Sequence, residues 1–92
     1  MAKHIKQVAG IFTPYTELMN FLGSKAKNIT KIGIQLPGGS YAIIDGKEFE
    51  IGKTGILEFE DVKISSVKFR SHNANTRQQM YVIMDCVYDD TE

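Results

Sequence analysis

The sequence predicts a mainly β fold: a compact antiparallel β-sandwich or small barrel of six to seven strands, with one short N-terminal amphipathic helix. Three observations lead to this prediction. Runs that alternate apolar and polar residues recur from residue 29 onward, as in half-buried strands. Turn-forming residues lie close together between Pro37 and Gly55. Parallel strands need long, usually helical crossovers, and the chain has no room for them after Asn28, so we expect antiparallel sheets.

The composition is that of an ordinary globular domain. The 92 residues are 42% hydrophobic and 24% charged, and 11 basic residues balance 11 acidic ones. This length supports one modest core, so we expect a single domain, 1–92, with an N-terminal strand and helix segment, 1–28, and a β core, 29–90. The zero net charge provides no overall field that would attract nucleic acid or an anionic membrane. The single cysteine, Cys86, excludes an internal disulfide and is expected to be a small buried hydrophobe.

The stretch "TPYTELMNFLG" predicts the short helix. Thr13 suits the N-cap, Pro14 the first helical position and Gly23 the C-terminal stop. The apolar side chains fall at helical spacing on one stripe, which consists of Tyr15, Leu18, Met19 and Leu22. This stripe could cap the core of its own chain. Alternatively, it could dock against a neighbouring chain, for which the candidate residues are Tyr15, Leu18 and Leu22.

Strands are predicted on both sides of this helix. A first strand is expected at residues 4–12, "HIKQVAGIF". Later, "ITKIGIQL" alternates apolar with polar residues, and "YAIID" and "KEFEI" flank Asp45-Gly46. That dipeptide is a strong hairpin signal because both residues tolerate positive φ. In "VKISSVKF" the apolar register switches across Ser65-Ser66, which predicts a bulge or bend there.

The segment "GKEFEIGKTG" contains the Gly-Lys-Thr end of a phosphate-binding loop, which would indicate a nucleotide-binding protein. The full motif needs a glycine five positions before Gly52, and that position is Lys47. A phosphate loop also opens a helix, whereas Gly55 is followed by "ILEFEDVKISSVKF", which is rich in strand formers. We therefore interpret Gly52 to Gly55 as a tight turn between two strands.

The closing strand, "MYVIMDCVY", is apolar on both faces. One face carries Met80, Val82, Met84, Cys86 and Tyr88, and the other carries Tyr81, Ile83 and Val87. Such a strand is either central in a layered fold or covered on one face by a partner chain. The candidate self-association residues are Met80, Val82, Met84 and Tyr88. Asp85 interrupts the apolar run, and it needs a hydrogen-bond partner if its neighbours are buried.

The sequence indicates no catalytic, cofactor-binding or metal site. His4 and His72 are far apart in the chain and show neither metal-ligand spacing nor a nucleophile and a third group beside them. Four glutamates alternate with apolar residues: Glu48, Glu50, Glu58 and Glu60. That alternation is typical of the solvent face of strands and not of paired catalytic carboxylates. We therefore predict a protein that is not an enzyme.

A basic cluster is the one feature that favours nucleic acid. It consists of Lys63, Lys68, Arg70 and Arg77, with Phe69 and Tyr81 nearby. Basic and aromatic residues on a small β fold can bind single strands. The zero net charge and the acidic C-terminal run oppose this interpretation, so we expect neither nucleic acid nor a membrane as a partner.

Several short motifs carry a family resemblance. They are the Ile-Gly-Ile of "ITKIGIQL", the segment "IGKTGILEFE", the segment "ISSVKF" and the closing apolar-Asp-x-x-Tyr strand. Over Ile29 to Asp90, about two-thirds of the chain, they resemble a module of small virion structural proteins in phages and prophages of Gram-positive bacteria.

The resemblance implies a non-enzymatic component of a phage tail, baseplate or head. Such a component would form a homo-oligomer, contact other virion structural proteins, and pass from the host cytoplasm into the virion. The resemblance also implies that "GKTGI" belongs to a hairpin, and it leaves residues 1–28 as a docking element. The alternative function is a small β-sandwich module that binds a host surface glycan or protein. The absence of tryptophan and the four scattered tyrosines weigh against glycan binding.

Overall fold

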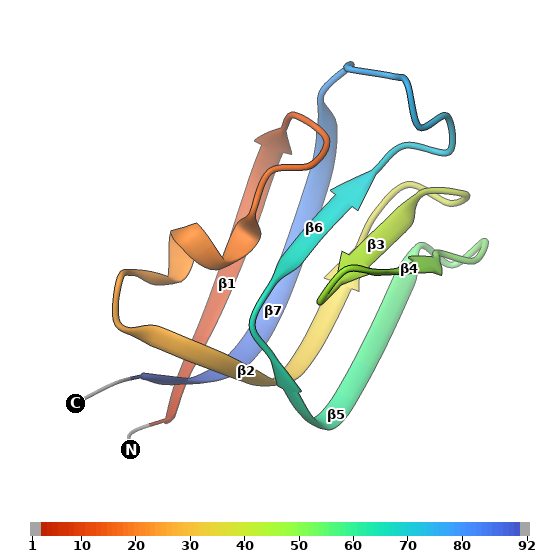
Figure 1. Cartoon of the computed structure of the whole chain (residues 1–92). Coiled ribbons are helices and arrows are strands. Elements are labelled where there is room, and N and C mark those ends of the chain that lie inside the picture. Colours follow the sequence, from red (N-terminus) through yellow and green to blue (C-terminus); the bar gives the residue numbers. More distant parts are fainter. Residues whose placement is uncertain (1–2, 91–92) are drawn as a thin grey trace.

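A computed structural model describes residues 3–90, and residues 1–2 and 91–92 lie outside the described range. Strands make up 59% of the structure. The elements are β1 (Lys3–Phe12), the 3-10 helix η1 (Leu18–Leu22), β2 (Ala26–Gln35), β3 (Tyr41–Ile44), β4 (Lys47–Glu50), β5 (Ile56–Ile64), β6 (Val67–Arg70) and β7 (Met80–Asp90) (Figure 1).

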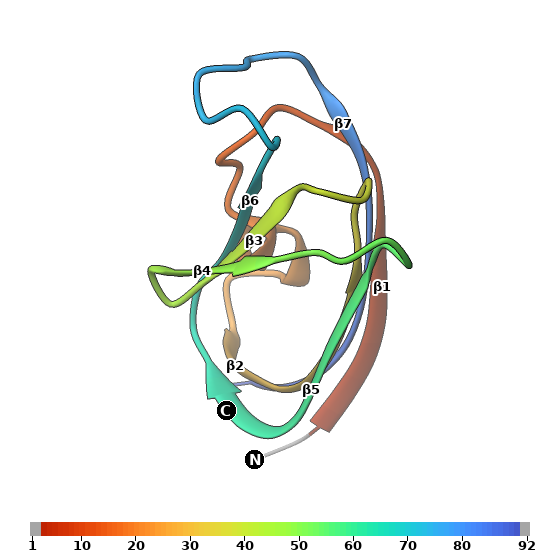
Figure 2. The same cartoon turned by 90° about the vertical axis from the view of Figure 1, so that its right-hand side faces the viewer.

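The strands form two antiparallel sheets. One has the order β1-β7-β2-β5 and the other has the order β4-β3-β6. Figure 2 shows the four-stranded sheet along one side of the molecule and β3, β4 and β6 along the other. The prediction of a mainly β, antiparallel fold is confirmed, whereas the small-barrel alternative is wrong because the sheets do not close.

The core lies between the two sheets. Its largest fully buried side chains are Phe69, Leu18, Ile29, Ile32, Ile34, Ile51, Met84, Val67 and Val82. Leu18 comes from η1 and Ile51 follows β4, and the others lie on strands of both sheets with their side chains turned away from solvent. The core therefore depends on all three parts of the fold.

β7 is a central strand, as one of the two sequence interpretations predicted. It pairs with β1 on one side and β2 on the other. Its inward-facing residues are buried, and they are Met80, Val82, Met84, Cys86 and Tyr88. The expectation of a buried Cys86 is confirmed. Burial, together with the nearby charge of Asp85, raises the pKa of the Cys86 thiol to about 11, so the thiol is protonated and unreactive at neutral pH.

The predicted N-terminal amphipathic helix is wrong. The chain forms only the short 3-10 helix η1, which is capped by Glu17 and not by Thr13. Tyr15 has φ +71, which an α-helix cannot contain. Its N–H donates instead to the carbonyl oxygen of Phe69 on β6 at 2.7 Å. The segment between β1 and η1 is therefore held against β6 and cannot enter a helix.

The apolar stripe of this segment belongs to the core of its own chain. η1 contacts both β1 and β6, and Leu18 and Leu22 are 0% and 5% exposed. Of the two alternatives, the stripe follows the one in which it caps the core of its own chain, and Leu18 and Leu22 offer no surface for docking because their side chains are already covered. Tyr15 remains partly exposed, at 38%, and its hydroxyl donates to the carbonyl oxygen of Ala74 at 3.3 Å.

The expected division into 1–28 and 29–90 does not describe the core. β1 pairs with β7 along its whole length, from Lys3 opposite Asp89 to Phe12 opposite Met80, and Val8 contributes a buried side chain. Residues 29–90 alone would leave β7 without this neighbour. The N-terminal segment is thus a structural part of the four-stranded sheet.

The chain passes from one sheet to the other at Ser65-Ser66, between β5 and β6. The predicted bend is confirmed, and two carboxylates hold it. Asp45 Oδ1 accepts hydrogen bonds from the backbone N–H groups of Ser65 and Ser66 at 3.0 and 2.9 Å. Glu17 accepts from the Ser66 hydroxyl at 2.5 Å and from the Val67 N–H at 2.7 Å. We call this arrangement the serine corner.

The two predicted turns are also present. Asp45 and Gly46 have φ values of +48 and +83 and connect the paired strands β3 and β4. The Gly55 N–H donates to the carbonyl oxygen of Gly52 at 3.0 Å, which closes the tight turn. The expectation that this second turn belongs to a hairpin is wrong, since β4 and β5 lie in different sheets and the turn carries the chain between them.

The two glycines of this turn should respond differently to substitution. Gly55 has φ +76, and a Cβ there would lie 2.7 Å from the carbonyl oxygen of Leu36. Gly55→Ala is therefore expected to lower the free energy of unfolding by at least about 2 kcal/mol. Gly52→Ala is the control, because a Cβ at Gly52 would meet no atom within 4 Å, and its effect should stay within about 0.5 kcal/mol. Urea unfolding of the two variants measures the difference. Equal losses would contradict the turn geometry.

The position of η1 can be tested in the same way. Leu18→Ala removes a fully buried side chain and should cost about 2–5 kcal/mol of unfolding free energy. Phe21, on the same 3-10 helix, is 44% exposed and packs against Phe12 with ring centroids 5.0 Å apart. Phe21→Ala should cost about 1 kcal/mol. A Leu18→Ala chain that melts like the wild type would place η1 outside the core.

Candidate interaction surface

The outer surface of the four-stranded sheet carries exposed apolar side chains. Ile5 and Ile11 of β1 are 87% and 64% exposed, and Tyr81 and Ile56 are also exposed. We define the outer patch as the apolar residues that point away from the core on this sheet: Ile5, Ala9, Ile11, Ile56, Tyr81, Ile83 and Val87. The ladders place them on one face of the pleat, and on β7 this face alternates with the buried residues of the core.

Strand register brings these residues together. Ile5 lies opposite Val87, and Ile11 lies opposite Tyr81. Ala9 lies opposite Ile83 in the same ladder. Gln35 of β2 pairs with Ile83 on one side and with Ile56 on the other. The outer patch therefore extends across the sheet from β1 to β5.

A shallow depression of about 480 Å³ lies within this surface. Gly33 of β2 lines the depression. Its ladder partners are Asp85 of β7 and Glu58 of β5, and the space between their side chains stays open because glycine has no side chain. Ile5 and Ile56 line opposite sides of the depression. It thus combines apolar walls with two carboxylates.

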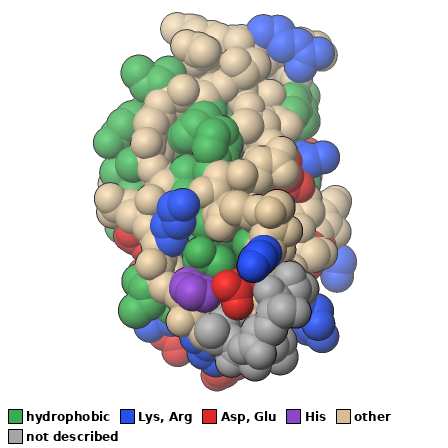
Figure 3. Space-filling model, turned by 90° about the vertical axis from the view of Figure 1, so that its left-hand side faces the viewer, with side chains coloured by type: hydrophobic (Ala, Val, Ile, Leu, Met, Phe, Trp, Pro, Cys, Tyr) green, Lys and Arg blue, Asp and Glu red, His purple; other side chains and the backbone are tan. Residues whose placement is uncertain are grey.

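Polar contacts surround the apolar residues. The Lys3 ammonium lies 3.2 Å from Asp89, and the Lys31 ammonium lies 3.5 Å from Glu60. Figure 3, which views the side that carries β1, shows hydrophobic side chains mainly at the left and centre, with charged side chains in the lower half and at the right. Apolar surface bordered by polar groups is the usual anatomy of a protein–protein contact.

Asp85 has the hydrogen-bond partner that the sequence analysis required. Its carboxylate accepts from the side-chain amide of Gln7 at 2.9 Å. The two residues lie opposite each other on β7 and β1. Because Asp85 is exposed, the contact joins two surface groups and does not offset burial of a charge.

The proposed self-association residues of β7 lie on its inner side. Met80, Val82, Met84 and Tyr88 are all buried in the core of their own chain, so they offer no surface to a partner in the folded protein. The opposite face of the same strand, with Tyr81, Ile83 and Val87, points to solvent instead. Sequence reasoning missed Ile5, Ile11 and Ile56. These residues could have been found from the sequence, because each lies at the same alternating strand positions as a polar residue, Gln7 or Glu58, that is expected to face solvent.

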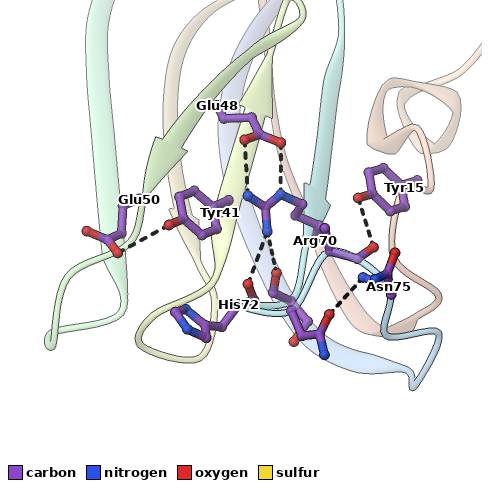
Figure 4. A network of polar contacts seen from close by, with 10 residues as sticks. Tyr15, Tyr41, Glu48, Glu50, Arg70, His72 and Asn75 are labelled. Carbon is purple, nitrogen blue, oxygen red and sulfur yellow. Dashed lines mark hydrogen bonds and ion pairs between the residues drawn. The ribbon is translucent and has the colours of Figure 1, made fainter.

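A second surface feature surrounds Arg70 at the end of β6 (Figure 4). Its guanidinium donates to both carboxylate oxygens of Glu48, at 2.8 and 3.1 Å. It also donates to the carbonyl oxygens of Ser71 and His72, and it lies 3.9 Å from the ring centroid of Tyr41. The hydrogen bond raises the pKa of Arg70 and lowers the pKa of Glu48. Arg70 thus links β6 to β4 and fixes the start of the following loop.

This arrangement does not assemble the basic and aromatic platform considered from the sequence. Phe69 is fully buried and cannot stack on a base. Tyr81 belongs to the other sheet. The donors of Arg70 are directed at protein oxygens, as described above, while Arg77 lies 5.9 Å from the ring centroid of Tyr15.

The glutamates considered as catalytic pairs are divided between two sheets. Glu48 and Glu50 lie on β4, and Glu58 and Glu60 lie on β5. Between Lys3 and Asp90, no group of three or more histidine, cysteine, aspartate or glutamate side chains could hold a metal ion. No helix within that range is long and apolar enough to cross a membrane.

Comparison with known proteins adds no assignment: no family model, curated protein or solved structure matches this chain.

The Arg70–Glu48 pair should make stability depend on pH. Because the folded-state pKa of Glu48 lies below its ordinary value of 4.5, the stabilisation is present above that value and is lost as the pH falls through the folded-state pKa. Arg70→Met should therefore destabilise the chain at neutral pH, and its deficit relative to the wild type should shrink at about pH 3. Urea midpoints at both pH values measure the deficit. Lys68→Met, on the same strand, is the control. A loss of stability in Arg70→Met that is the same at both pH values would contradict a stabilising Arg70–Glu48 ion pair.

Proposed function

We propose that this chain is a non-enzymatic structural component of a phage or phage-derived particle, which acts through self-association and contacts with other particle proteins. The observation that carries the proposal is the outer patch, which gathers exposed apolar side chains on one face of the four-stranded sheet. The motif resemblance over residues 29–90 supports the particle as its setting.

The outer patch is not needed by the fold. The core between the two sheets includes side chains from both sheets and from η1, and none of the most exposed members of the patch belongs to it. The exposed Gln7–Asp85 pair lies between the parts of the patch, and exposed apolar side chains gathered on one face are typical of interaction sites. In this proposal the two sheets act as a compact antiparallel sandwich, of which one face packs in an assembly.

Solution mass tests the proposal. Sedimentation velocity of the wild-type chain at micromolar concentrations is expected to show a multimer. Ile83→Lys places a charge at the centre of the outer patch and should lower the mass, with no larger change in melting temperature than its control shows. Ile43→Lys is the matched control, because Ile43 is a similarly half-buried residue of the central strand β3 in the other sheet.

Antibody labelling of particles purified from the producing bacterium tests the setting. The chain is expected on the particle, at a position where many copies repeat. A chain that stays monomeric at high micromolar concentration and is absent from particles would overturn the proposed function. A monomer whose melting temperature rises with a host glycan would favour the binding-module alternative.

A further inference from the structure

β1 is a long open edge of the four-stranded sheet. It pairs with β7 and with no other strand in the described range. Its ten residues therefore present a row of backbone N–H and C=O groups that can accept another strand. Ile5 and Ile11, its two most exposed apolar residues, lie six positions apart on the same face.

The other sheet edges are protected in ways that β1 is not. β6 is covered along its outer side by Tyr15 and Glu17, which bond to the backbone of Phe69 and Val67. β4 has four residues, of which three are charged. β5 carries Glu58, Glu60, Asp61 and Lys63, and Asp61 interrupts it with φ +53. β1 also carries Lys3 and Lys6, but it is ten residues long and its ladder with β7 has no break. Short or irregular edges resist pairing, so β1 is the edge best able to accept a strand.

We propose that β1 pairs antiparallel with β1 of a second copy of this chain, around a two-fold axis at Val8, so that two four-stranded sheets join into one continuous sheet. The inference rests on the proposed function, because it names the partner and geometry of one contact within the multimer, the pairing of two β1 edges, which is separate from packing of the outer face at Ile83.

The sequence of β1 selects this register. Residues directly opposite each other in an antiparallel pair share one face of the sheet. With Val8 on the axis, Ile5 of one copy lies opposite Ile11 of the other, and the same contact occurs twice. Lys6 then lies opposite Gly10, which brings no positive charge to it.

Neighbouring registers fit less well. An axis at Gln7 would place Ile11 opposite Lys3. An axis at Lys6 would place two lysine side chains opposite each other, which is unfavourable for like charges. An axis at Ala9 would place Ile11 opposite Gln7. The register centred on Val8 is the one that pairs both exposed isoleucines.

This pairing also joins the outer patches of the two copies. Within each chain, Ile5 lies beside Val87, and Ile11 lies beside Tyr81. Across the new junction the apolar row therefore runs from Val87 through Ile5 to the second copy's Ile11 and Tyr81. The two-fold axis repeats this row on its other side, so the joined sheet offers two such apolar rows to a further particle protein, with Gln7 and Asp85 of each copy between them.

Disulfide trapping in a Cys86→Ala background tests the register. Ile5→Cys and Ile11→Cys chains, carrying different tags, are mixed and oxidised with glutathione disulfide. The expected product is the mixed dimer that links positions 5 and 11, identified by peptide mass. Gln7→Cys alone would link to itself only with the axis at Gln7, and Ala9→Cys alone only with the axis at Ala9. Either of these products in place of the mixed dimer overturns the register.

Charge substitution tests the pairing independently. The double variant Ile5→Lys/Ile11→Lys should keep the wild-type melting temperature, because both side chains are mostly exposed, and should lose the dimer in sedimentation. Ile56→Lys, an exposed isoleucine on the opposite edge strand of the same sheet face, should keep the dimer. If the wild type associates but the double variant keeps its mass, the β1 pairing is overturned while the proposed function stands. A wild-type monomer that is absent from particles overturns both.

Discussion

The fold depends on the serine corner, where two carboxylates satisfy the backbone as the chain leaves one sheet for the other. Neither Ser65 nor Ser66 has a place in a strand ladder, so their N–H groups are free to bond to a side chain. Asp45 provides one for both, and the Asp45 N–H in turn donates to the carbonyl oxygen of Ser66 at 3.0 Å. Glu17 accepts from Val67, whose side chain is fully buried. Leaving such a donor unpaired would cost about 1–3 kcal/mol.

The two carboxylates come from distant parts of the chain, and this explains why the N-terminal segment was predicted incorrectly. The local signals at Thr13, Pro14 and Gly23 favour a helix. They cannot reveal that Glu17 bonds to residues 49 and 50 positions further along, or that Tyr15 donates to β6. These long-range hydrogen bonds replace those of the first helical turn. The tertiary contacts therefore override the local helix propensity of the segment. The turn at Asp45-Gly46 and the bend at the serine corner could be predicted, because each follows from the conformational or register requirements of adjacent residues.

The interaction surface was less predictable for a related reason. A strand that is apolar on both faces gives no local signal for which face points inward. The face of β7 with Met80, Val82, Met84 and Tyr88 was therefore predicted to be available to a partner, although it is the buried one. The choice is made by its neighbours: β1 and β2 fix the pleat of β7, and Val8 and Ile32 lie opposite Met84 and Cys86 in the two ladders. The pairing of β1 with β7 joins the two ends of the described chain, and periodicity within either strand does not specify it. Ile5 and Ile11 were overlooked because their importance appears only when that ladder is formed.

The groups that stabilise the folded chain are different from the groups that are available for association. The serine corner and η1 complete the core within one chain, so the outer patch and the free edge of β1 contribute little to holding that chain together. The segment before η1 covers β6, β4 is short and β5 is interrupted at Asp61, whereas β1 is long and regular. Because the core is complete without the free edge of β1, residues on that edge can change association with little effect on the free energy of unfolding. A substitution such as Ile5→Lys, for example, alters only an exposed side chain. Association through β1 would then control how the apolar face is presented, because joining two sheets extends that face without changing either core.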